Sequence, residues 1–570
     1  MPWRIAACLF LLLSYLFAQA PAGRVTPPEI LNLKRIPTEK EIPGGGRHRS
    51  PIFVQMPQGP LHAYSLRTVH GVTEEVIQTS TDDGRTWSTP VTAFKLPAGF
   101  GDVGAPKLLL DSRGQIHLFM PVNPRRTAGD YHQQQWNLWY VRSTDAPFHW
   151  AAPKEIWKGY VGSLQSAIQL RSGRIVLPFC FLTQRSWSNR GSGPDAFTYT
   201  GKFSSSVLYS DDGGDSWIQS TELKTPTPDI TTILGAIEPV VLELRDGRVW
   251  MLIRTQMGRF YESFSADGAE WSRPRPSEII SSDSPAGLIR LKDGRILLIW
   301  NNCLRFPYAY GGRHVLHAAV SEDEGRSWRG YREILRDPSR DRPPLPSGDF
   351  GVSYSLPALL NDGKAIFGFG YYRDIPAVLL DPRWLYATSQ HADFSTGLDE
   401  WSTFGTRGVE IVPHPQRSGA RVLSLRKPEA DWPAAAVWNF PAGGKGSLSL
   451  RLLLKPGFRG ASLGLTDHFS VPFDLEDRIF NLVNLKIGPN GELANGKSLG
   501  LGRWHQLKFD WDTSRYQCRV MLDGHQIQVV PLTRMSRWGV SYLRIRSTAE
   551  STDDAGLLVE SVEADTSLSW

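Results

Sequence analysis

Cysteine is scarce in this chain, which has 4 cysteines and 7 methionines among 570 residues, against 20 tryptophans. Removal of an N-terminal leader would leave Cys180, Cys303 and Cys518, an odd and widely spaced set. Such a set excludes a disulfide framework and has no metal-ligand spacing, although one disulfide remains possible. We therefore expect buried thiols, no bound metal and no cofactor. The excess of tryptophan over methionine favours short strands anchored by aromatics over a helical bundle.

The sequence also lacks a strong excess of charge and, beyond its start, long apolar runs. The 63 Lys and Arg against 57 Asp and Glu give a net charge of +6. This mild excess favours acidic partners, but no run of Lys or Arg is typical of a nucleic-acid-binding tail. No later apolar run reaches the length of a membrane span. Nucleic-acid binding and a polytopic membrane protein are therefore not expected.

Residues 1–20 have the three parts of a signal peptide. Arg4 is the basic residue, an apolar stretch follows from Ile5 to Phe17, and Ala18-Gln19-Ala20 matches a cleavage site. The apolar stretch is shorter than the roughly 20 residues of a membrane span. We expect a secreted or periplasmic protein with no stable membrane insertion after cleavage.

One short motif, Ser-x-Asp-x-Gly-x-Thr/Ser-Trp, recurs through the first two thirds of the chain. The full copies are STDDGRTW from Ser80, SDDGGDSW from Ser210 and SEDEGRSW from Ser321, and the reduced copies are STDAPFHW from Ser143 and SADGAEW from Ser265. Asp and Gly favour a hairpin turn, and the tryptophan is expected to pack between strands. Repetition at this spacing predicts a repeat architecture.

A second turn recurs in step with the first and precedes short apolar strands. Its central glycines are Gly59, Gly114, Gly173, Gly247, Gly294 and Gly363. Two hairpins per unit predict a four-stranded antiparallel sheet, and six such units predict a six-bladed β-propeller. We place this propeller at residues 25–390 and expect a strand near the N-terminus to complete the last blade.

Residues 391–570 lack the Asp-containing turn and alternate apolar with polar residues, as in SLSLRLLL from Ser447. A hairpin is predicted about Asp523-Gly524. The all-β fold class thus continues in a C-terminal β-sandwich, of a jelly-roll, lectin-like kind. Trp432 and Trp538 would suit glycan binding if they are exposed. The alternative is that they are core residues of a domain that supports the propeller.

The repeated turn in a predicted six-unit propeller resembles the Asp-box, or BNR-repeat, proteins of the sialidase (neuraminidase) superfamily. The resemblance implies three arginines that hold a substrate carboxylate, since a guanidinium matches a carboxylate with two parallel hydrogen bonds and stays charged. From the segments RSPIFVQMPQGPLHAYSLR, IEPVVLELRDGRVWMLIRT and GRHVLHAAVSEDEGRSW, these arginines are Arg49, Arg254 and Arg313. Arg47 and Arg305 are the alternatives if the register differs.

The resemblance also implies a tyrosine nucleophile with a glutamate base. Tyr354, in VSYSLPALLNDGKAIFGFG, matches the tyrosine strand of the family, and Glu238 matches the glutamate. A tyrosine suits a sugar whose anomeric carbon bears a carboxylate, because a carboxylate nucleophile would be repelled. Since a free tyrosine has a pKa near 10, a base must take its proton.

The chain differs from the family pattern at its general acid. The family has an Asp six residues before the first Asp-box serine, where this chain has Glu74. Glu74 can do the same work if its pKa is raised, whereas Glu75 should lie on the opposite face of the strand. The family also has an Asp-Pro pair in its second blade, where this chain has Ala105-Pro106. The glutamate that usually supports the first arginine of the family is missing here near Gly370-Tyr371. Asp102 is a possible accessory residue.

The leading expectation is an exported, retaining exo-α-sialidase-like glycosidase that acts on glycans with terminal α-linked sialic acid or a related carboxylated sugar. Glu74, Glu238 and Tyr354 would be catalytic, and Arg49, Arg254 and Arg313 would bind the carboxylate. Two alternatives remain open. One is a propeller glycosidase or lyase for a uronic-acid polysaccharide, and the other is a non-catalytic glycan-binding protein.

Overall fold

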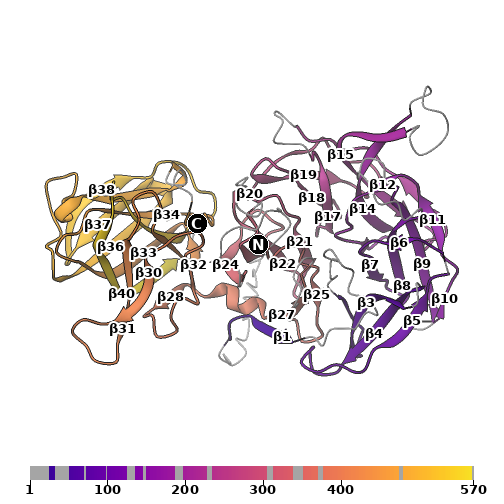
Figure 1. Cartoon of the computed structure of the whole chain (residues 1–570). Coiled ribbons are helices and arrows are strands. Elements are labelled where there is room, and N and C mark those ends of the chain that lie inside the picture. The colour runs from indigo at the N-terminus through magenta and orange to yellow at the C-terminus, as the bar shows by residue number, and fades with distance from the viewer. Residues whose placement is uncertain are drawn as a thin grey trace, which may run out of the picture.

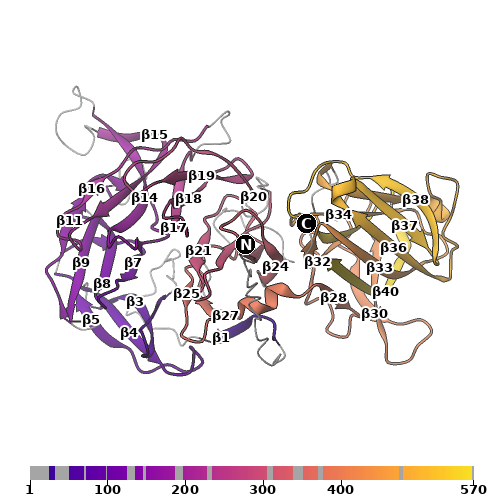
Figure 2. The same ribbon diagram turned by 180° about the vertical axis from the view of Figure 1, so that it is seen from behind.

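The computed structural model describes residues 25–32, 51–69, 72–97, 99–124, 135–145, 149–186, 197–226, 234–304, 312–337, 351–369, 376–473 and 479–567. Strands dominate this part of the chain, so the predicted all-β class is confirmed (Figures 1 and 2). Short 3-10 helices lie at η5 (Pro382–Tyr386), η7 (Pro489–Gly491) and η8 (Thr513–Arg515). No helix in the described ranges is long and apolar enough to cross a membrane. The predicted signal peptide, residues 1–20, lies outside these ranges.

Six antiparallel sheets are formed by the strands that precede η5, and Figure 1 shows them around a common centre. Sheet I contains β2 (Ile52–Gln55), β3 (Leu61–Val69), β4 (Val72–Ser80) and β5 (Val91–Lys95). Sheet II contains β6 (Asp102–Val103), β7 (Lys107–Leu110), β8 (Ile116–Asn123), β9 (Asn137–Asp145), β10 (His149–Trp150) and β11 (Lys154–Trp157). Sheet III contains β12 (Tyr160–Val161), β13 (Ile168–Gln169), β14 (Ile175–Ser186), β15 (Phe197–Ser210) and β16 (Ile218–Gln219).

The other three sheets follow the same order along the chain. Sheet IV contains β17 (Ile237–Glu243), β18 (Val249–Arg254), β19 (Arg259–Ser265) and β20 (Arg275–Ile280). Sheet V contains β21 (Gly287–Arg290), β22 (Ile296–Trp300), β23 (Val315–Ser321) and β24 (Arg329–Arg336). Sheet VI contains β25 (Ala358–Leu359), β26 (Ala365–Phe367), β27 (Pro376–Leu380) and β1 (Glu29–Asn32), so a strand near the N-terminus completes the last sheet, as expected.

Each of the six sheets packs against the next through a buried apolar cluster. Phe119 of sheet II, for example, packs in one cluster with Phe179 of sheet III. Corresponding clusters join sheets I and II, III and IV, IV and V, and V and VI. Sheet VI packs on sheet I through a cluster that contains Ile366 and Phe53. The six sheets therefore form a closed ring.

The Asp-box turns have the predicted conformation. In the first copy, the hydroxyl of Ser80 donates to Asp82 Oδ1 over 2.8 Å and accepts from the Gly84 amide over 2.9 Å. The Asp82 carboxylate accepts from the Thr86 amide and hydroxyl over 2.8 and 2.7 Å. Equivalent bonds hold the copies that start at Ser210 and Ser321. Each turn thus satisfies its own polar groups at the edge of a sheet.

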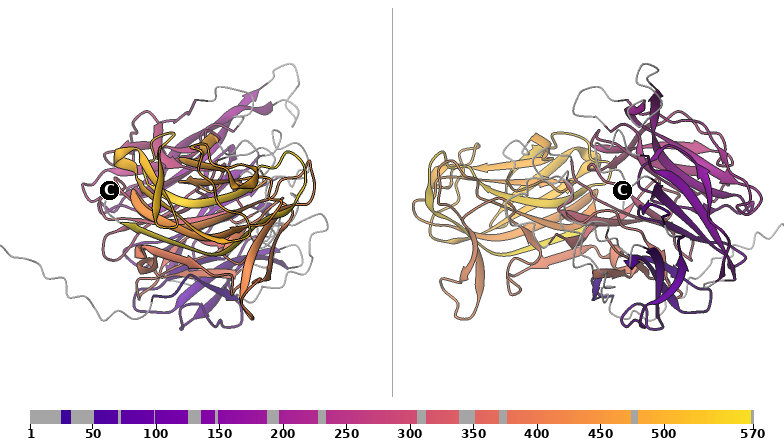
Figure 3. Two further views of the ribbon diagram at one scale, coloured as in Figure 1. Left: turned by 90° about the vertical axis from the view of Figure 1, so that its left-hand side faces the viewer. Right: turned by 45° about the vertical axis from the view of Figure 1, so that its right-hand side comes forward.

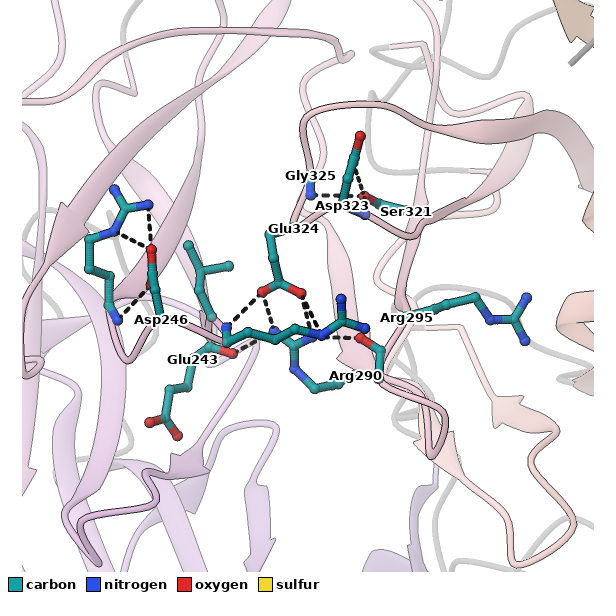
Figure 4. Close-up of polar contacts among 12 residues, drawn as sticks. Glu243, Asp246, Arg290, Arg295, Ser321, Asp323, Glu324 and Gly325 are labelled. Atoms are coloured by element: carbon teal, nitrogen blue, oxygen red, sulfur yellow. Dashed lines mark hydrogen bonds and ion pairs between the residues drawn. The ribbon is translucent and has the colours of Figure 1, made fainter. Parts of the chain in front are cut away.

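The glycine of each turn lies against the preceding sheet. A Cβ added to Gly325 of sheet V would come within 3.1 Å of Trp250 of sheet IV, and Gly325 has a φ of +83°. Figure 4 shows the neighbouring contacts, in which Arg290 donates to both carboxylate oxygens of Glu324. Arg290 also donates to the Glu243 carbonyl of sheet IV over 2.7 Å. The Asp-box turns therefore join neighbouring sheets as well as neighbouring strands.

We expect the Asp323→Ala variant to lose roughly 1.5–3 kcal/mol of unfolding free energy, the usual contribution of hydrogen bonds to a charged group. Burial alone would raise the pKa of Asp323, but hydrogen bonds from Ser327 and Ser321 lower it. Because the folded-state pKa is depressed, this stabilisation is present above the unfolded pKa and is lost as pH falls through the folded one. Urea unfolding at neutral and acidic pH measures the effect. An equal loss in Asp293→Ala, whose carboxylate accepts hydrogen bonds from the amide and side chain of Arg295, would contradict it.

Two further sheets follow η5 and share one core. Sheet VII contains β28 (Ser389–Ala392), β30 (Val409–Pro413), β31 (Arg421–Lys427), β33 (Lys445–Leu454), β36 (Trp504–Asp512), β37 (Gln517–Leu522), β38 (His525–Pro531) and β40 (Asp553–Ser567). Sheet VIII contains β29 (Trp401–Ser402), β32 (Ala435–Gly443), β34 (Ala461–Thr466), β35 (Val483–Ile487) and β39 (Val540–Ser547). Asp523 and Gly524 have φ values of 50° and 84° between β37 and β38, which confirms the predicted hairpin.

A cavity of about 480 Å³ lies over sheet VII. Its lining includes Lys508, which pairs with Asp510 over 2.9 Å, and Asp512, which lies 3.6 Å from both Lys445 and Arg515. The charged groups of this cavity therefore largely neutralise one another.

The two C-terminal sheets, named here the C-terminal part, pack beside sheet V of the ring (Figure 3). Trp538 is only 7% exposed, stacks on Tyr331 of sheet V and donates to the Glu278 carbonyl. Trp432 donates to the Gly405 carbonyl and lies under the guanidinium of Arg407. The idea that Trp538 is an exposed glycan-binding aromatic is therefore wrong, because the interface with the ring buries it.

Candidate active site

Three predicted site residues meet in one buried cluster. The hydroxyl of Tyr354 donates to Glu238 Oε1 over 3.0 Å, and Arg254 Nη1 donates to the Tyr354 oxygen over 2.8 Å. The same Nη1 also bonds Glu238 Oε2. All three side chains are at most 9% exposed. Residues that lie 16 and 100 positions from Arg254 in sequence therefore share one hydrogen-bonded network.

The sheet topology explains how these side chains meet. Glu238 lies at the start of β17, and Arg254 at the end of β18, where Ile237 is paired with Arg254. Tyr354 lies shortly before β25, the first strand of sheet VI. First strands of neighbouring sheets contact one another, as β17 contacts β21 and β2 contacts β25. Residues that precede or begin these strands are therefore gathered near the centre of the ring.

Glu238 and Tyr354 both have left-handed backbone conformations, with φ values of 49° and 61°. The pairing register of β17 also shifts between Ile237 and Val240, next to Glu238. A left-handed non-glycine residue costs roughly 1–3 kcal/mol and persists only where the surrounding structure fixes it. Glu238 and Tyr354, which share a hydrogen bond, therefore both have strained backbone conformations.

Asp283 is a member of the cluster that sequence reasoning missed. It accepts from Arg254 Nε over 2.9 Å and from Gln256 over 2.8 Å. Its carbonyl accepts from Arg313 Nη2 over 2.8 Å. A signal for it existed, since Asp283 precedes Pro285 and strand β21 much as Glu238 precedes Pro239 in β17. Asp283 links the two candidate arginines of the described site.

Arg313 lies beside Tyr354, with its guanidinium carbon 5.3 Å from the tyrosine ring centre. It is 2% exposed. Arg254 lies 6.0 Å from the same ring centre. Two of the three predicted arginines are therefore placed around Tyr354, and the third, Arg49, lies outside the described residues, as do Arg47 and Arg305.

Charge compensation determines the protonation of this cluster. Burial alone would lower the pKa of Arg254, but Glu238, Tyr354 and Asp283 raise it well above its ordinary value. Burial alone would raise the pKa of Asp283, but Arg254, Gln256 and Arg313 lower it. Arg254 and Asp283 are therefore both charged at neutral pH. No group of three or more His, Cys, Asp or Glu able to hold a metal ion occurs in the described part of the chain.

Glu74 lies in β4 among groups that favour its charged form. Arg67 donates to its carboxylate over 2.5 Å and Thr92 over 2.9 Å, and Lys95 lies 3.6 Å away. Burial alone would raise the pKa of Glu74, but these partners lower it below its ordinary value. Glu74 therefore lacks the raised pKa that a general acid requires. Its catalytic role stays a prediction.

Asp102, the predicted accessory residue, is exposed in β6 opposite Asn123. Glu75 is only 1% exposed, whereas its neighbour Glu74 faces Arg67 and Lys95. Burial, together with the negative charge of nearby Glu75, raises the pKa of Tyr64. The two glutamates therefore lie on opposite faces of sheet I, as predicted. Cys180, Cys303 and Cys518 are buried thiols, which confirms that expectation.

If Glu74 is a proton donor in catalysis, its lowered pKa sets the pH profile of turnover. An acid must be protonated to act, so kcat/KM should fall with rising pH throughout the range above about pH 5. The Glu74→Gln variant should lose this dependence together with most of its turnover. A basic limb near neutral pH that survives in Glu74→Gln would assign proton donation to another group.

Comparisons with known proteins agree with this architecture. Residues 100–368 match the family described as BNR repeat-like domain. A curated sialidase from Bacteroides fragilis is 26% identical over 293 residues, which is 45% of this chain and 48% of the relative, so the match spans about half of that relative's length.

Two solved structures are also similar to this chain. A Trypanosoma rangeli sialidase in complex with 2,3-difluorosialic acid is 15% identical, with coverage of 95% of this chain and 96% of that one and a TM-score of 0.43. A Dyadobacter fermentans protein is 17% identical, with coverage of 63% and 99% and a TM-score of 0.43. With the family match and the curated relative, the predicted resemblance of this chain to the BNR-repeat proteins of the sialidase superfamily is confirmed.

Proposed function

We propose that this protein is a retaining exo-α-sialidase-like glycosidase with Tyr354 as nucleophile. The observation that carries the proposal is the hydrogen bond from the Tyr354 hydroxyl to Glu238 Oε1, 3.0 Å long and buried. Through this bond, Glu238 is placed as a base to take the phenolic proton. A tyrosine needs such a base in order to attack at neutral pH. Tyrosine nucleophiles are a known exception among glycosidases, most of which use two carboxylates.

In the first step, the Tyr354 oxygen bonds to the anomeric carbon as its proton passes to Glu238. The bond from that carbon to the leaving oxygen breaks, and a general acid, proposed to be Glu74, protonates that oxygen. Water then attacks the same carbon and gives a proton to Glu74, while the bond from that carbon to the Tyr354 oxygen breaks and Tyr354 takes its proton back from Glu238. Arg254 donates to the Tyr354 oxygen over 2.8 Å and so stabilises the negative charge that develops there.

Arg254 and Arg313, together with Arg49, are proposed to bind the substrate carboxylate. Glu238 and Asp283 both form ion pairs with Arg254, and Arg313 donates to the Asp283 carbonyl, so this group contains two guanidiniums and two carboxylates. Net charge within this described group therefore gives little attraction for an anion. Recognition would depend on the direction of guanidinium hydrogen bonds, which match a planar carboxylate.

The ring of six sheets is proposed to be a six-bladed β-propeller over residues 25–390, with the site at its centre. The closed series of apolar clusters from sheet I to sheet VI supports this assignment. The C-terminal part is proposed to be a β-sandwich of jelly-roll type over residues 391–570. We also propose that the protein is exported, with sialylated or other acidic glycans as its substrates.

The test is incubation of the purified protein with an aryl α-sialoside and measurement of aryl-alcohol release. We expect release that Arg254→Ala abolishes. An aryl β-glucuronide and an acidic polysaccharide serve as competing substrates, because a uronate glycosidase would release the aryl group and a lyase would form an unsaturated uronate. Activity on these substrates alone, or intact glycan after prolonged incubation, would contradict the proposal.

A further inference from the structure

Asn301 is a fully buried amide that follows strand β22 and joins three separate segments. Its Oδ1 accepts from the Ser284 hydroxyl over 2.7 Å. Its Nδ2 donates to the carbonyls of Val315 and Val352 over 2.7 and 2.8 Å. The Asn301 side chain thus forms hydrogen bonds to three different stretches of chain, one through its oxygen and two through its nitrogen.

Each of those stretches carries a residue of the candidate active site. Ser284 directly follows Asp283, Val315 lies two residues after Arg313, and Val352 lies two residues before Tyr354. Two of the stretches are also joined directly, since the Val352 amide donates to the Arg313 carbonyl over 2.9 Å. Gly351, with a φ of +98°, allows this approach, because a Cβ there would lie 2.3 Å from the Arg313 oxygen.

The next residue, Asn302, is held by the C-terminal part. Its Nδ2 donates to the Asp467 carbonyl over 3.0 Å, and its own carbonyl accepts from the Phe469 amide over 2.8 Å. Its amide donates to His317 Nδ1 over 3.1 Å. Asn301 and Asn302 thus connect the candidate site with the C-terminal part through adjacent residues.

A chain of polar groups continues from His317 into the interface. Because His317 Nδ1 accepts from an amide, its Nε2 carries the proton and donates to Tyr542 Oη over 2.5 Å. Tyr542 in turn donates to Glu333 Oε1 over 2.7 Å. All of these groups are buried, and burial lowers the pKa of His317 to about 3. His317 therefore stays neutral across the working range of pH.

We propose that Asn301 is a positioning residue for the active site and that Asn302 extends this support to the C-terminal part. The C-terminal part is then a component of the catalytic unit and not an independent attached module. Asn301 touches no substrate; it fixes the separation of the segments that carry Asp283, Arg313 and Tyr354. This inference rests on the proposed function for its kinetic readout, but not for its structural readout.

The kinetic test compares three variants on an aryl α-sialoside. Asn301→Ala should lower kcat by about 100-fold with a change in KM below about threefold, since small displacements of reacting groups cost about this much. Asn302→Ala should lower kcat by about tenfold by the same mechanism. Asn439→Ala is the matched control, because the hydrogen bonds of Asn439, to the Glu333 amide and the Ser541 carbonyl, lie across the same interface but outside the three segments that carry Asp283, Arg313 and Tyr354. It should stay within about twofold of the parent rate. An equal loss of kcat in Asn439→Ala would overturn the proposal.

A milder variant covers the case in which Asn301→Ala fails to fold. Asn301→Asp keeps the acceptor for Ser284 and regains one donor when its carboxyl group is protonated. The ratio of its kcat to that of the parent should therefore rise as pH falls. A ratio that is constant with pH would count against the positioning role.

Hydrogen exchange gives the readout that needs no activity. Asn301→Ala should increase amide exchange in residues 281–290, 312–318 and 351–358 together, and Asn439→Ala should not. If the parent protein does not cleave the sialoside, the proposed function fails while the exchange result still decides the role of Asn301. Unchanged exchange in these three segments would overturn the proposal even in an active enzyme.

Discussion

Tyr354→Phe should lower kcat on an aryl α-sialoside by about 10³-fold or more, while affinity for a non-hydrolysable sialoside changes by less than about threefold. Loss of a covalent nucleophile has effects of this size or greater in other hydrolases. The phenylalanine ring keeps the packing beside Arg313, and the ion pair between Arg254 and Glu238 is not altered. We therefore expect the variant to fold and bind but not to turn over.

Tyr331 offers a matched control for this substitution. It is also buried, with 1% exposure, and has a φ of 51°, but its hydroxyl has no hydrogen-bond partner in the described structure. Tyr331→Phe should leave kcat within about twofold of the parent value. Burst kinetics with rapid quenching would show whether an aryl group is released once per Tyr354→Phe molecule. Turnover at near the parent rate in Tyr354→Phe would remove the tyrosine from the mechanism.

The sequence allowed prediction of those site residues whose neighbours are set by local pattern. Glu238 and Arg254 flank one hairpin, so their spacing predicts that they lie near each other across two paired strands. The turn residues were predictable for the same reason, since Ser, Asp, Gly and Thr of an Asp box bond within eight residues. In these cases the partner of each side chain lies close in sequence.

Residues whose role depends on distant partners were not predictable in this way. Asp283 bonds Arg254 and Arg313 from 29 and 30 residues away, and the nearby Pro285 alone does not distinguish it from a loop aspartate. Asn301 bonds Val352 at a separation of 51 residues. Trp538 resembles an exposed aromatic in sequence, and only the interface with sheet V buries it. Contacts between neighbouring sheets of the ring bring such residues together. The pattern of residues within a single strand does not predict these contacts.

The lowered pKa of Glu74 has a similar origin. Arg67 and Lys95 lie opposite Glu74 on the two neighbouring strands, and this register places two positive charges beside the carboxylate. A strand register of this kind follows from the hairpin only after both turns are fixed. The pH profile of turnover is consequently the most direct test of Glu74 as the proton donor of the proposed mechanism.

The second large effect is expected at Arg254, where Arg254→Met should affect both turnover and stability. Methionine replaces the stem of the side chain but leaves Glu238 and Asp283 without their common cation. Removal of one partner from a buried ion pair costs roughly 3–5 kcal/mol, because the remaining charge is not compensated. Turnover should fall below detection, since the donor to the Tyr354 oxygen is lost as well.

The pH dependence of this stability loss separates charge from packing. In the parent protein, Arg254 helps to keep the pKa of Asp283 below its ordinary value, so its stabilisation is present above the unfolded pKa and disappears as pH falls through the folded one. In Arg254→Met, Asp283 can relieve its repulsion with Glu238 by taking up a proton. The difference in unfolding free energy between parent and variant should therefore shrink as pH falls. A difference that is the same at pH 4 and pH 7 would indicate that the arginine acts through packing alone.

A second substitution tests the same argument from the other side. Adding Asp283→Asn to Arg254→Met removes one of the two uncompensated charges, so the double variant should recover part of the lost stability but none of the turnover. Arg290→Met is the control, because Arg290 also forms an ion pair, with Glu324, but joins sheets IV and V away from the candidate site. It should reduce stability and leave kcat within about twofold. Recovery of turnover in the double variant would mean that Arg254 serves only to neutralise Asp283, and the carboxylate-binding role would then pass to the other arginines.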